Sequence, residues 1–252
     1  MKILSCNILI DRLSPKKHPW ESRRSTCIDT ITNENADIIC HQEMSYAQHL
    51  EFKNALPDHT AIDTNINTNN DPLNCIWYKT NKFEQTQVFH LSLPNSLKQQ
   101  DSPKRLRRYL NGIKLLDIAS NQEFVILNTH LNYECEELVL LQTKNIINYI
   151  NTTFTQVTKI ILAGDMNHEH DSNIMQKYFT ANLSDSYKDK HGNSYPGPSF
   201  HSFKSSYKKQ SKVDWILTKN LSKQIINSTV LDNIAPENCG SDHFFISAEI
   251  KL

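Results

Sequence analysis

The chain has 252 residues, of which 38% are hydrophobic and 21% are charged, and its 27 basic and 27 acidic residues give a formal net charge of zero. This length is enough to bury a large core, so we expect one domain over residues 1–252. The neutral charge argues against a non-specific binder of long nucleic acid, whose affinity comes mainly from Lys and Arg, although it allows a local basic groove.

Six scattered cysteines show no paired spacing, so the sequence indicates neither a zinc site nor a disulfide framework. Free thiols in a reducing compartment are the simpler interpretation. The N-terminal apolar run is too short for a signal peptide, and we expect no membrane span. We therefore expect a cytoplasmic protein, with secretion by a route that needs no N-terminal signal as the alternative.

The chain begins with an apolar, β-branched stretch over residues 2–10, which predicts a strand interrupted by Asn7. An amide there is either satisfied by neighbouring backbone or faces a polar site. The spacing of apolar residues over 20–33 predicts an amphipathic helix, with Arg23 and Arg24 on its solvated face.

A second buried strand is predicted over residues 37–43, and it ends in Glu43. Glutamate is rarely buried without a partner, so at a strand tip it is either solvated or bound to a cation. A helix over 45–56, ended by Pro57, and a polar loop over 60–73 follow.

Residues 75–78 and 88–93 are predicted to be strands on either side of a turn. The most basic run of the chain, residues 104–108, then precedes a strand over 109–118. A run of charges is usually a solvated face, so on its own this run indicates no binding site.

The centre of the chain repeats the pattern of a buried strand with a polar end. One strand over 124–130 ends in His130, a helix follows over 134–151, and the next strand ends in Asp165. Residues two apart on a strand share a face, so Asp165 and Asn167 are expected to point the same way at the strand's carboxyl end. A strand-to-turn exit is the alternative explanation of these two residues.

The last third is mostly polar over residues 168–210. It continues with a strand over 212–217 that carries Asp214, and it closes with the segment 240–243 and a strand over 244–250. A linker or a second domain is not indicated.

Five predicted strands therefore carry a polar group at or near the tip. Each such residue alone is usually a satisfied core residue, but together they supply oxygen ligands that suit Mg²⁺ or Mn²⁺, with positions left for phosphate oxygens. Zinc would require more His and Cys with tighter spacing. The residues are Asn7, Glu43, His130, Asp165, Asn167, Asp214, Asp242 and His243.

This set suits hydrolysis of a phosphate ester. A metal neutralises the phosphate charge, a carboxylate or imidazole orients the attacking water, and donors stabilise the transition state. Asp214 would hold His243 in one tautomer and favour its cationic form. The sequence contains no G-x-S-x-G elbow or P-loop that would support acyl or nucleotide-triphosphate chemistry.

Six short segments, in order and spacing, resemble the endonuclease/exonuclease/phosphatase (DNase I-like) superfamily, which includes pancreatic-type deoxyribonucleases and abasic-site endonucleases. The resemblance covers nearly the whole chain and implies a four-layer α/β sandwich, with two mixed, mainly antiparallel sheets packed face to face and helices outside. The segments are Cys6-Asn7, His41-Gln42-Glu43, Asn128-Thr129-His130-Leu131, Gly164-Asp165-Met166-Asn167, Val213-Asp214-Trp215 and Gly240-Ser241-Asp242-His243.

The resemblance also implies a role for each residue near the metal. Glu43 would bind the essential Mg²⁺, helped by Asn7, and Asp242 would bind or tune the metal. Asp165 would orient or activate the water, and Asn167 would hold a phosphate oxygen.

On the substrate side, the resemblance implies that His243 contacts the scissile phosphate with Asp214 behind it, and that His130 contacts phosphate. Residues 20–24 and 199–203 further resemble bacterial metal-dependent hydrolases of this superfamily. Arg108 is similar to an arginine that contacts phosphate in that branch, and His201 is a second substrate-side candidate.

One position departs from the pattern. Relatives often carry a glutamate that supports the histidine matched by His130, where this chain has Pro72, with Asp71 the nearest acid. Either Asp71 substitutes for the glutamate or His130 is held differently.

The sequence thus predicts a Mg²⁺-dependent phosphodiesterase, either a nuclease or an enzyme of small molecules, that works by metal-assisted attack of water. The expected partner is a short nucleic acid or a phosphorylated small molecule, and the expected state is a monomer. The alternatives are a phosphomonoesterase of inositol or lipid phosphates, a secreted toxin-like enzyme of either kind, and a non-catalytic binding module on the same fold.

Overall fold

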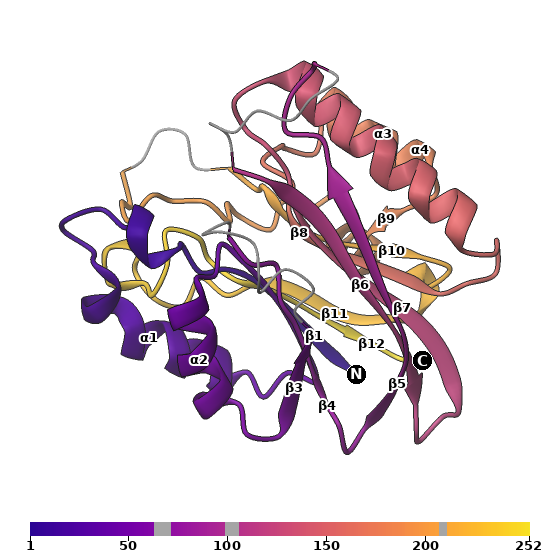
Figure 1. The fold of residues 1–252 in the computed structure, drawn as a ribbon, viewed down its shortest axis with the longest axis horizontal. Helices are drawn as coiled ribbons and strands as arrows, with labels where there is room; N and C mark the ends of the chain where they lie inside the picture. The colour runs from indigo at the N-terminus through magenta and orange to yellow at the C-terminus, as the bar shows by residue number, and fades with distance from the viewer. Residues whose placement is uncertain (63–71, 99–105, 207–210) are drawn as a thin grey trace.

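The computed structural model describes residues 1–62, 72–98, 106–206 and 211–252. Within these ranges, two six-stranded β-sheets pack face to face, and helices cover the outer face of each sheet (Figure 1). This arrangement confirms the predicted four-layer α/β sandwich. In the described part of the chain, no helix is both long enough and apolar enough to cross a bilayer.

The first sheet has the strand order β11-β12-β1-β2-β4-β3. Its strands are β1 (Lys2–Asn7), β2 (Ile38–Gln42), β3 (His59–Ile62), β4 (Ile76–Lys79), β11 (Ile225–Val230) and β12 (Ile246–Ile250). Strands β1 and β2 run parallel, with Asn7 beside Gln42, and the other described pairs are antiparallel. The carboxyl ends of β1 and β2 therefore meet at one edge of the sheet.

The second sheet has the strand order β5-β6-β7-β8-β10-β9. Its strands are β5 (Phe83–Leu93), β6 (Arg108–Asp117), β7 (Gln122–His130), β8 (Ile160–Asp165), β9 (Ser184–Asp185) and β10 (Asp214–Lys219). Strands β7 and β8 are parallel, with His130 beside Asp165. Because β10 runs antiparallel to β8, its first residue, Asp214, lies on the other side of Asp165.

Five α-helices lie in the described ranges, with short 3-10 helices at Asp11–Leu13, Ser222–Gln224 and Pro236–Asn238. The α-helices are α1 (Trp20–Asn33), α2 (Tyr46–Ala55), α3 (Glu136–Thr153), α4 (Asn173–Thr180) and α5 (Ser186–His191). Helix α2 begins at a capping box, in which the side chains of Ser45 and Gln48 each accept a hydrogen bond from the other's backbone N–H. This cap fixes the chain two residues after Glu43.

Alternating side chains divide the strands between separate hydrophobic layers, because successive residues of a strand point to opposite faces. Ile3 and Ile161 lie in the core between the sheets. Leu4 packs in the layer formed with α1 and α2, whereas Leu162 packs in the layer formed with α3 and α4. Both faces of β1 and β8 are thus covered, which explains their nearly continuous apolar sequences.

Five strands and α-helices were not predicted. Strand β3, within the segment expected to be a loop, is a four-residue edge strand with mostly exposed or half-buried side chains. Helices α4 and α5 and the two-residue strand β9 lie in the mostly polar stretch 168–210, where no helix or strand was predicted. Helix α4 is held by a buried face of Ile174, Met175 and Tyr178. Strand β11 also lies at a sheet edge and has three polar residues among six. Weak patterns at edges and in short helices account for these omissions.

Candidate active site

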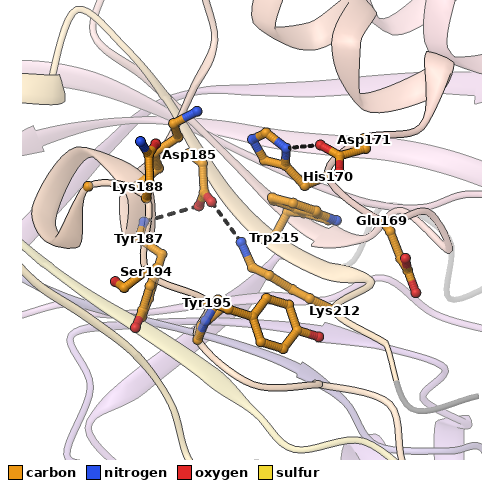
Figure 2. A pocket seen from close by; sticks show the side chains of 13 residues that line it. Glu169, His170, Asp171, Asp185, Tyr187, Lys188, Ser194, Tyr195, Lys212 and Trp215 are labelled. Carbon is orange, nitrogen blue, oxygen red and sulfur yellow. Dashed lines mark hydrogen bonds and ion pairs between the residues drawn. The ribbon is translucent and has the colours of Figure 1, made fainter. Parts of the chain in front are cut away.

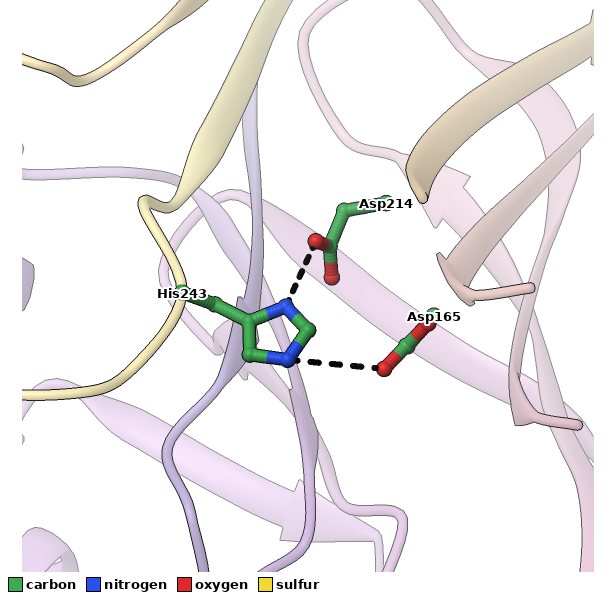
Figure 3. Close-up of side chains that lie close together, drawn as sticks. All are labelled: Asp165, Asp214 and His243. Carbon is green, nitrogen blue, oxygen red and sulfur yellow. Dashed lines mark hydrogen bonds and ion pairs between the residues drawn. The ribbon is translucent and has the colours of Figure 1, made fainter. Parts of the chain in front are cut away.

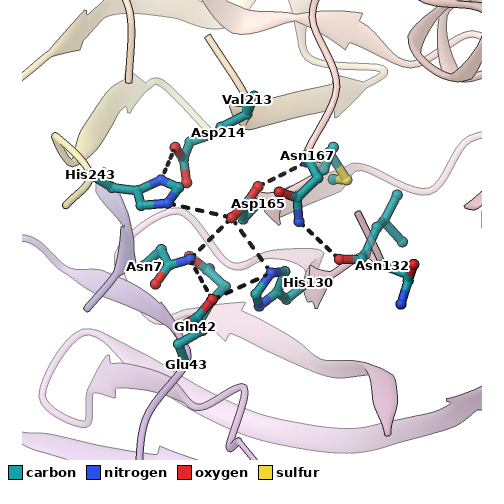
Figure 4. Close-up of polar contacts among 12 residues, drawn as sticks. Asn7, Gln42, Glu43, His130, Asn132, Asp165, Asn167, Val213, Asp214 and His243 are labelled. Carbon is teal, nitrogen blue, oxygen red and sulfur yellow. Dashed lines mark hydrogen bonds and ion pairs between the residues drawn. The ribbon is translucent and has the colours of Figure 1, made fainter. Parts of the chain in front are cut away.

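Polar residues from both sheets meet at one edge of the sandwich. Asn7 ends β1, Glu43 directly follows β2, His130 ends β7, Asp165 ends β8 and Asp214 begins β10. Figure 4 shows these side chains pointing toward one another, together with His243 from the segment before β12. The structure therefore brings residues from distant parts of the sequence into one cluster, as the sequence predicted.

The carboxylate of Asp165 lies at the centre of this cluster and is buried. Its Oδ2 accepts a hydrogen bond from Asn7 Nδ2 at 3.0 Å and lies 3.6 Å from His130 Nε2. Its Oδ1 accepts a hydrogen bond from the backbone N–H of Asn167 at 2.8 Å. Burial, followed by the negative charge of Asp214, raises the pKa of Asp165 to about 7. Asp165 can therefore gain or lose a proton near neutral pH.

Glu43 reaches the same cluster from the first sheet. Its Oε1 lies 3.3 Å from Asn7 Nδ2 and 3.7 Å from His130 Nε2. The backbone of Glu43 has φ of 52°, a left-handed conformation that is uncommon outside glycine and that clusters at functional sites. This conformation joins β2 to the capped start of α2.

Asn7 is oriented by its own turn. Its Oδ1 accepts a hydrogen bond from the backbone N–H of Leu9 at 3.0 Å, so its Nδ2 faces the carboxylates of Glu43 and Asp165. In this arrangement Asn7 holds two acidic groups in place, while its Oδ1 accepts a hydrogen bond from the turn that follows β1.

His243 and Asp214 form a buried pair (Figure 3). His243 Nδ1 lies 2.8 Å from Asp214 Oδ2, and His243 Nε2 lies 3.8 Å from Asp165 Oδ2. Burial alone lowers the pKa of His243, but the charge of Asp214 and its hydrogen bond, with Asp165 and Asp242, outweigh it and raise the pKa to about 10. His243 is therefore an imidazolium at neutral pH, with its Nε2–H directed into the cluster.

Arg108 and His130 form a second buried pair, with 2.9 Å between Arg108 Nη1 and His130 Nδ1. Burial lowers the pKa of His130 well below its usual value, and the charges of Arg108 and His243 lower it further. His130 is thus neutral. Of the two alternatives for His130, the structure shows Arg108 as its partner at Nδ1, while Asp71 lies outside the described residues.

The remaining predicted residues lie around this centre. Asn167 has φ of 55° and donates from Nδ2 to the carbonyl of Leu131 at 3.0 Å. Asp242 lies beside His243 in sequence. Burial raises the pKa of Asp242, and the positive charge of His243 only partly offsets this effect.

The structure places His201 behind the site. Its side chain is 0% exposed, its Nδ1 accepts a hydrogen bond from the N–H of Phe203 at 3.1 Å, and its ring lies 4.3 Å from that of Phe244. The backbone N–H of His201 also donates to the carbonyl of Asp242. A role in holding the segment before β12 fits this position better than the predicted substrate contact.

Sequence reasoning missed two amides beneath the site. Gln42 Nε2 donates to Asn128 Oδ1 at 2.8 Å, and Asn128 Nδ2 donates to the carbonyls of His41 and Cys75. These buried bonds join the two sheets directly below Glu43. The signal was present, because each amide interrupts an apolar strand just before a predicted site residue.

Ser199 and Ser241 were also missed. Ser199 Oγ accepts hydrogen bonds from the backbone N–H groups of Val213 and Asp214, both at 3.0 Å. Ser241 Oγ donates to the carbonyl of Asn7 at 2.6 Å. Serines in polar loops carry no distinguishing sequence pattern, so only the structure reveals these contacts.

A separate pocket of about 300 Å³ lies beyond β10 (Figure 2). Tyr187, Tyr195 and Trp215 line it together with Lys212, whose Nζ bonds Asp185 Oδ2 at 2.8 Å and lies 3.5 Å from the Trp215 ring centre. None of the predicted site residues lines this pocket, so the polar cluster remains the candidate active site.

No family model matches the sequence, and no curated protein shows significant sequence similarity to it. Several solved structures, however, share its fold over its whole length. The endonuclease/exonuclease/phosphatase from Bacteroides vulgatus is 21% identical, with a TM-score of 0.84 over 100% of this chain and 98% of that one.

The mannosyl-6-phosphatase Bt3783 from Bacteroides thetaiotaomicron is 17% identical, with a TM-score of 0.86 over 100% of both chains. The D. rerio TDP2 complexed with a single-strand DNA product is 15% identical, with a TM-score of 0.76 over 100% of this chain and 99% of that one. These similarities confirm that the chain has the DNase I-like fold of endonuclease/exonuclease/phosphatase proteins, as the sequence predicted.

Proposed function

We propose that this protein is a Mg²⁺-dependent phosphoesterase of the endonuclease/exonuclease/phosphatase superfamily that hydrolyses a phosphodiester. The observation that carries the proposal is the position of Asp165 Oδ2, which lies 3.0 Å from Asn7 Nδ2, 3.6 Å from His130 Nε2 and 3.8 Å from His243 Nε2. A single carboxylate with an amide and two imidazoles around it suits the activation of water next to a phosphate.

The donor set fits a hard divalent cation. Among the described residues, no Lys or Arg forms an ion pair with Glu43 or Asp165. The buried Asp165 carboxylate lies 3.8 Å from the cationic His243, whereas the half-buried Glu43 lies beside neutral His130 and has no cationic side chain paired with it there. Asp214 Oδ1 is likewise buried without a hydrogen-bond partner in the described ranges. Carboxylate oxygens are the ligands that Mg²⁺ and Mn²⁺ prefer, so both ions fit.

We assign the metal to Glu43 and Asp242, with Asn7 orienting the Glu43 carboxylate. When bound, the ion would neutralise charge on the phosphate and polarise its bonds. This assignment follows from chemistry and from the family resemblance, with Mn²⁺ as the possible replacement.

The protein's own groups divide the proton transfers between them. Asp165, with its pKa near neutrality, takes a proton from the attacking water, since a general base works best with a pKa close to the working pH. His243 donates from Nε2 to the phosphate or the leaving oxygen, and Asp214 keeps it cationic. His130 Nε2–H and Asn167 stabilise the phosphate oxygens.

The substrate we favour is a short nucleic acid or another diester. The neighbour in complex with single-strand DNA product supports a nucleic acid. The neighbour named as a mannosyl-6-phosphatase supports a phosphomonoester as the second candidate. In both cases the same carboxylate and imidazoles serve the chemistry.

A panel of esters tests the proposal. Bis-p-nitrophenyl phosphate, single-stranded oligonucleotides, plasmid DNA, inositol phosphates and sugar phosphates are assayed with Mg²⁺, Mn²⁺ or EDTA. We expect metal-dependent release from at least one ester, and a loss of about 100-fold in Glu43→Gln and in His243→Ala. Glu84→Gln, an exposed residue of β5, is the matched control. No hydrolysis of any ester with any ion would favour the non-catalytic binding module.

A further inference from the structure

Arg23 was expected on the solvated face of α1, but its side chain is turned inward and Arg23 is only 3% exposed. Its Nη1 donates to the carbonyl oxygens of Ile8 at 2.6 Å and of Gly240 at 2.8 Å. Its Nη2 donates to the carbonyl of Leu9 and to Ser14 Oγ. The guanidinium therefore ends in a cage of oxygen atoms from two distant parts of the chain.

The two parts of the chain are the ones that carry the site. Ile8 and Leu9 directly follow Asn7, and Gly240 precedes the segment that delivers His243. Leu9 has φ of 55°, so the chain turns sharply where Arg23 binds it. Carbonyl oxygens repel one another, and a buried planar cation with several fixed donors can hold three of them together.

The turn at Gly240 is packed tightly against helix α1. A Cβ atom at this residue would lie 2.3 Å from Cys27 Cα, so the turn packs directly on the backbone of α1. On its other side, Ser241 Oγ donates to the Asn7 carbonyl at 2.6 Å and accepts from the His243 N–H at 3.3 Å. The strand end with Asn7 and the turn before His243 are thus tied by Ser241 on one side and by Arg23 on the other.

We propose that Arg23 is a positioning residue that sets the distance between Asn7 and His243 by clamping the carbonyls of Ile8, Leu9 and Gly240. This inference rests on the proposed function, because Asn7 and His243 both approach Oδ2 of Asp165. Because Arg23 is almost completely buried, it acts through the backbone segments that it binds. It fixes the geometry in which Asp165 meets its donors.

Lysine cannot reproduce this clamp. Its single nitrogen offers three donors from one point, whereas the guanidinium uses two nitrogens in a rigid fork. Arg23→Lys therefore keeps the positive charge and the buried aliphatic part of the side chain, but it loses some of the hydrogen bonds to the surrounding oxygen atoms. Arg24 supplies the matched control, because it is the next residue of α1 and its exposed side chain pairs with Glu51 at 3.5 Å.

The test compares wild type, Arg23→Lys and Arg24→Lys, each first shown to be folded by circular dichroism. Steady-state kinetics are measured on an ester that the wild type hydrolyses, and amide hydrogen exchange is measured on all three proteins. For Arg23→Lys we expect kcat to fall by at least about 10-fold with KM within about twofold, because misplacement of catalytic groups affects the transition state. We also expect faster exchange at the His243 and Ile8 amides and unchanged exchange in β6 and β7. Arg24→Lys should match wild type in every respect.

Arg23→Gln is the second variant, because a neutral side chain leaves no uncompensated charge if the clamp is lost. Wild-type kcat in folded Arg23→Lys or Arg23→Gln, or exchange that rises uniformly over the protein, would overturn the proposal. Failure of both variants to fold would also overturn it, because Arg23 would then be required for the whole fold. If the wild type hydrolyses no ester, the proposed function fails while the exchange measurement still tests the clamp.

Discussion

Arg108 Nη1 lies 2.9 Å from His130 Nδ1, and this contact fixes which nitrogen of the imidazole carries the proton. A guanidinium can only donate, so Nδ1 must accept and the proton resides on Nε2. That Nε2–H points toward Asp165 Oδ2 at 3.6 Å and Glu43 Oε1 at 3.7 Å. Arg108 therefore orients the imidazole of His130.

The first prediction concerns this pair. Arg108→Met keeps a long buried side chain but removes the donor, so His130 can adopt the other tautomer. We expect kcat to fall by about 10- to 100-fold, the usual effect of removing a group that orients a functional imidazole. Arg107→Met, at the neighbouring exposed position, is the control. Equal activity in the two variants would show that Arg108 does not act through His130.

The second prediction concerns Asp214, whose removal should lower the pKa of His243. In wild type the pKa of His243 is raised to about 10, largely because Asp214 outweighs the effect of burial, so the ring stays protonated at neutral pH. Asp214→Asn should reduce kcat by about 10²- to 10⁴-fold, as in comparable acid–imidazole pairs. The alkaline limb of the variant's pH–rate profile should also move to lower pH. An unchanged alkaline limb, with exposed Asp171→Asn as the reference, would contradict this role.

The third prediction is that Asp165→Asn abolishes turnover yet stabilises the metal-free protein. The folded-state pKa of Asp165 is about 7, above its usual 3.8, so the folded protein binds this proton more tightly than the unfolded chain does. The contribution of Asp165 to the free energy of unfolding therefore falls as pH rises from about 4 to 7. Above that range the ionised Asp165 destabilises the folded protein.

Thermal melts in EDTA test this prediction. Asp165→Asn should raise Tm at pH 8 and change it much less at pH 5, where the wild-type carboxylate is already protonated. A lower Tm than wild type at pH 8 would show that the charge is compensated within the protein. Adding Mg²⁺ should raise the wild-type Tm, since a ligand that binds the folded state stabilises it.

The fourth prediction concerns the ion pair of Lys212 and Asp185, whose side chains are 7% and 6% exposed. Lys212→Met leaves the Asp185 charge buried, so we expect a loss of about 3 kcal/mol in the free energy of unfolding. Lys212→Met with Asp185→Asn should recover part of this loss, because no charge is then stranded. Urea unfolding of the single and double variants gives the comparison, and additive losses would contradict the coupling.

Much of the fold was predictable because its central strands are buried on both faces. The strands that end in Asn7, His130 and Asp165 are mainly apolar and have polar residues at their carboxyl ends, a pattern that a single sequence shows without an alignment. Edge strand β3 lacks such a run, since its exposed residues need not be apolar. Short helices α4 and α5 present too few turns for a clear period.

The candidate site was predictable in its members but not in its contacts. Motif order predicted Asp165 and His243 as neighbours, because each residue closes or precedes a central strand. The partner of His130 and the inward orientation of Arg23 were not predictable. From sequence alone, an arginine on a helix is expected to face solvent, and only coordinates show where its side chain lies. The sequence pattern indicates which faces of an element are apolar, but it does not indicate the conformation of a long polar side chain.

The cluster is supplied half by one sheet and half by the other, with the Gln42–Asn128 hydrogen bond bridging them underneath. Neither half carries a complete set of reacting groups. If the two sheets slid or separated, activity would therefore be lost before any single strand unfolded. In a urea titration, we expect activity to be lost together with, or before, the near-ultraviolet circular dichroism signal, and never after it. Activity would then report on the packing of one sheet against the other.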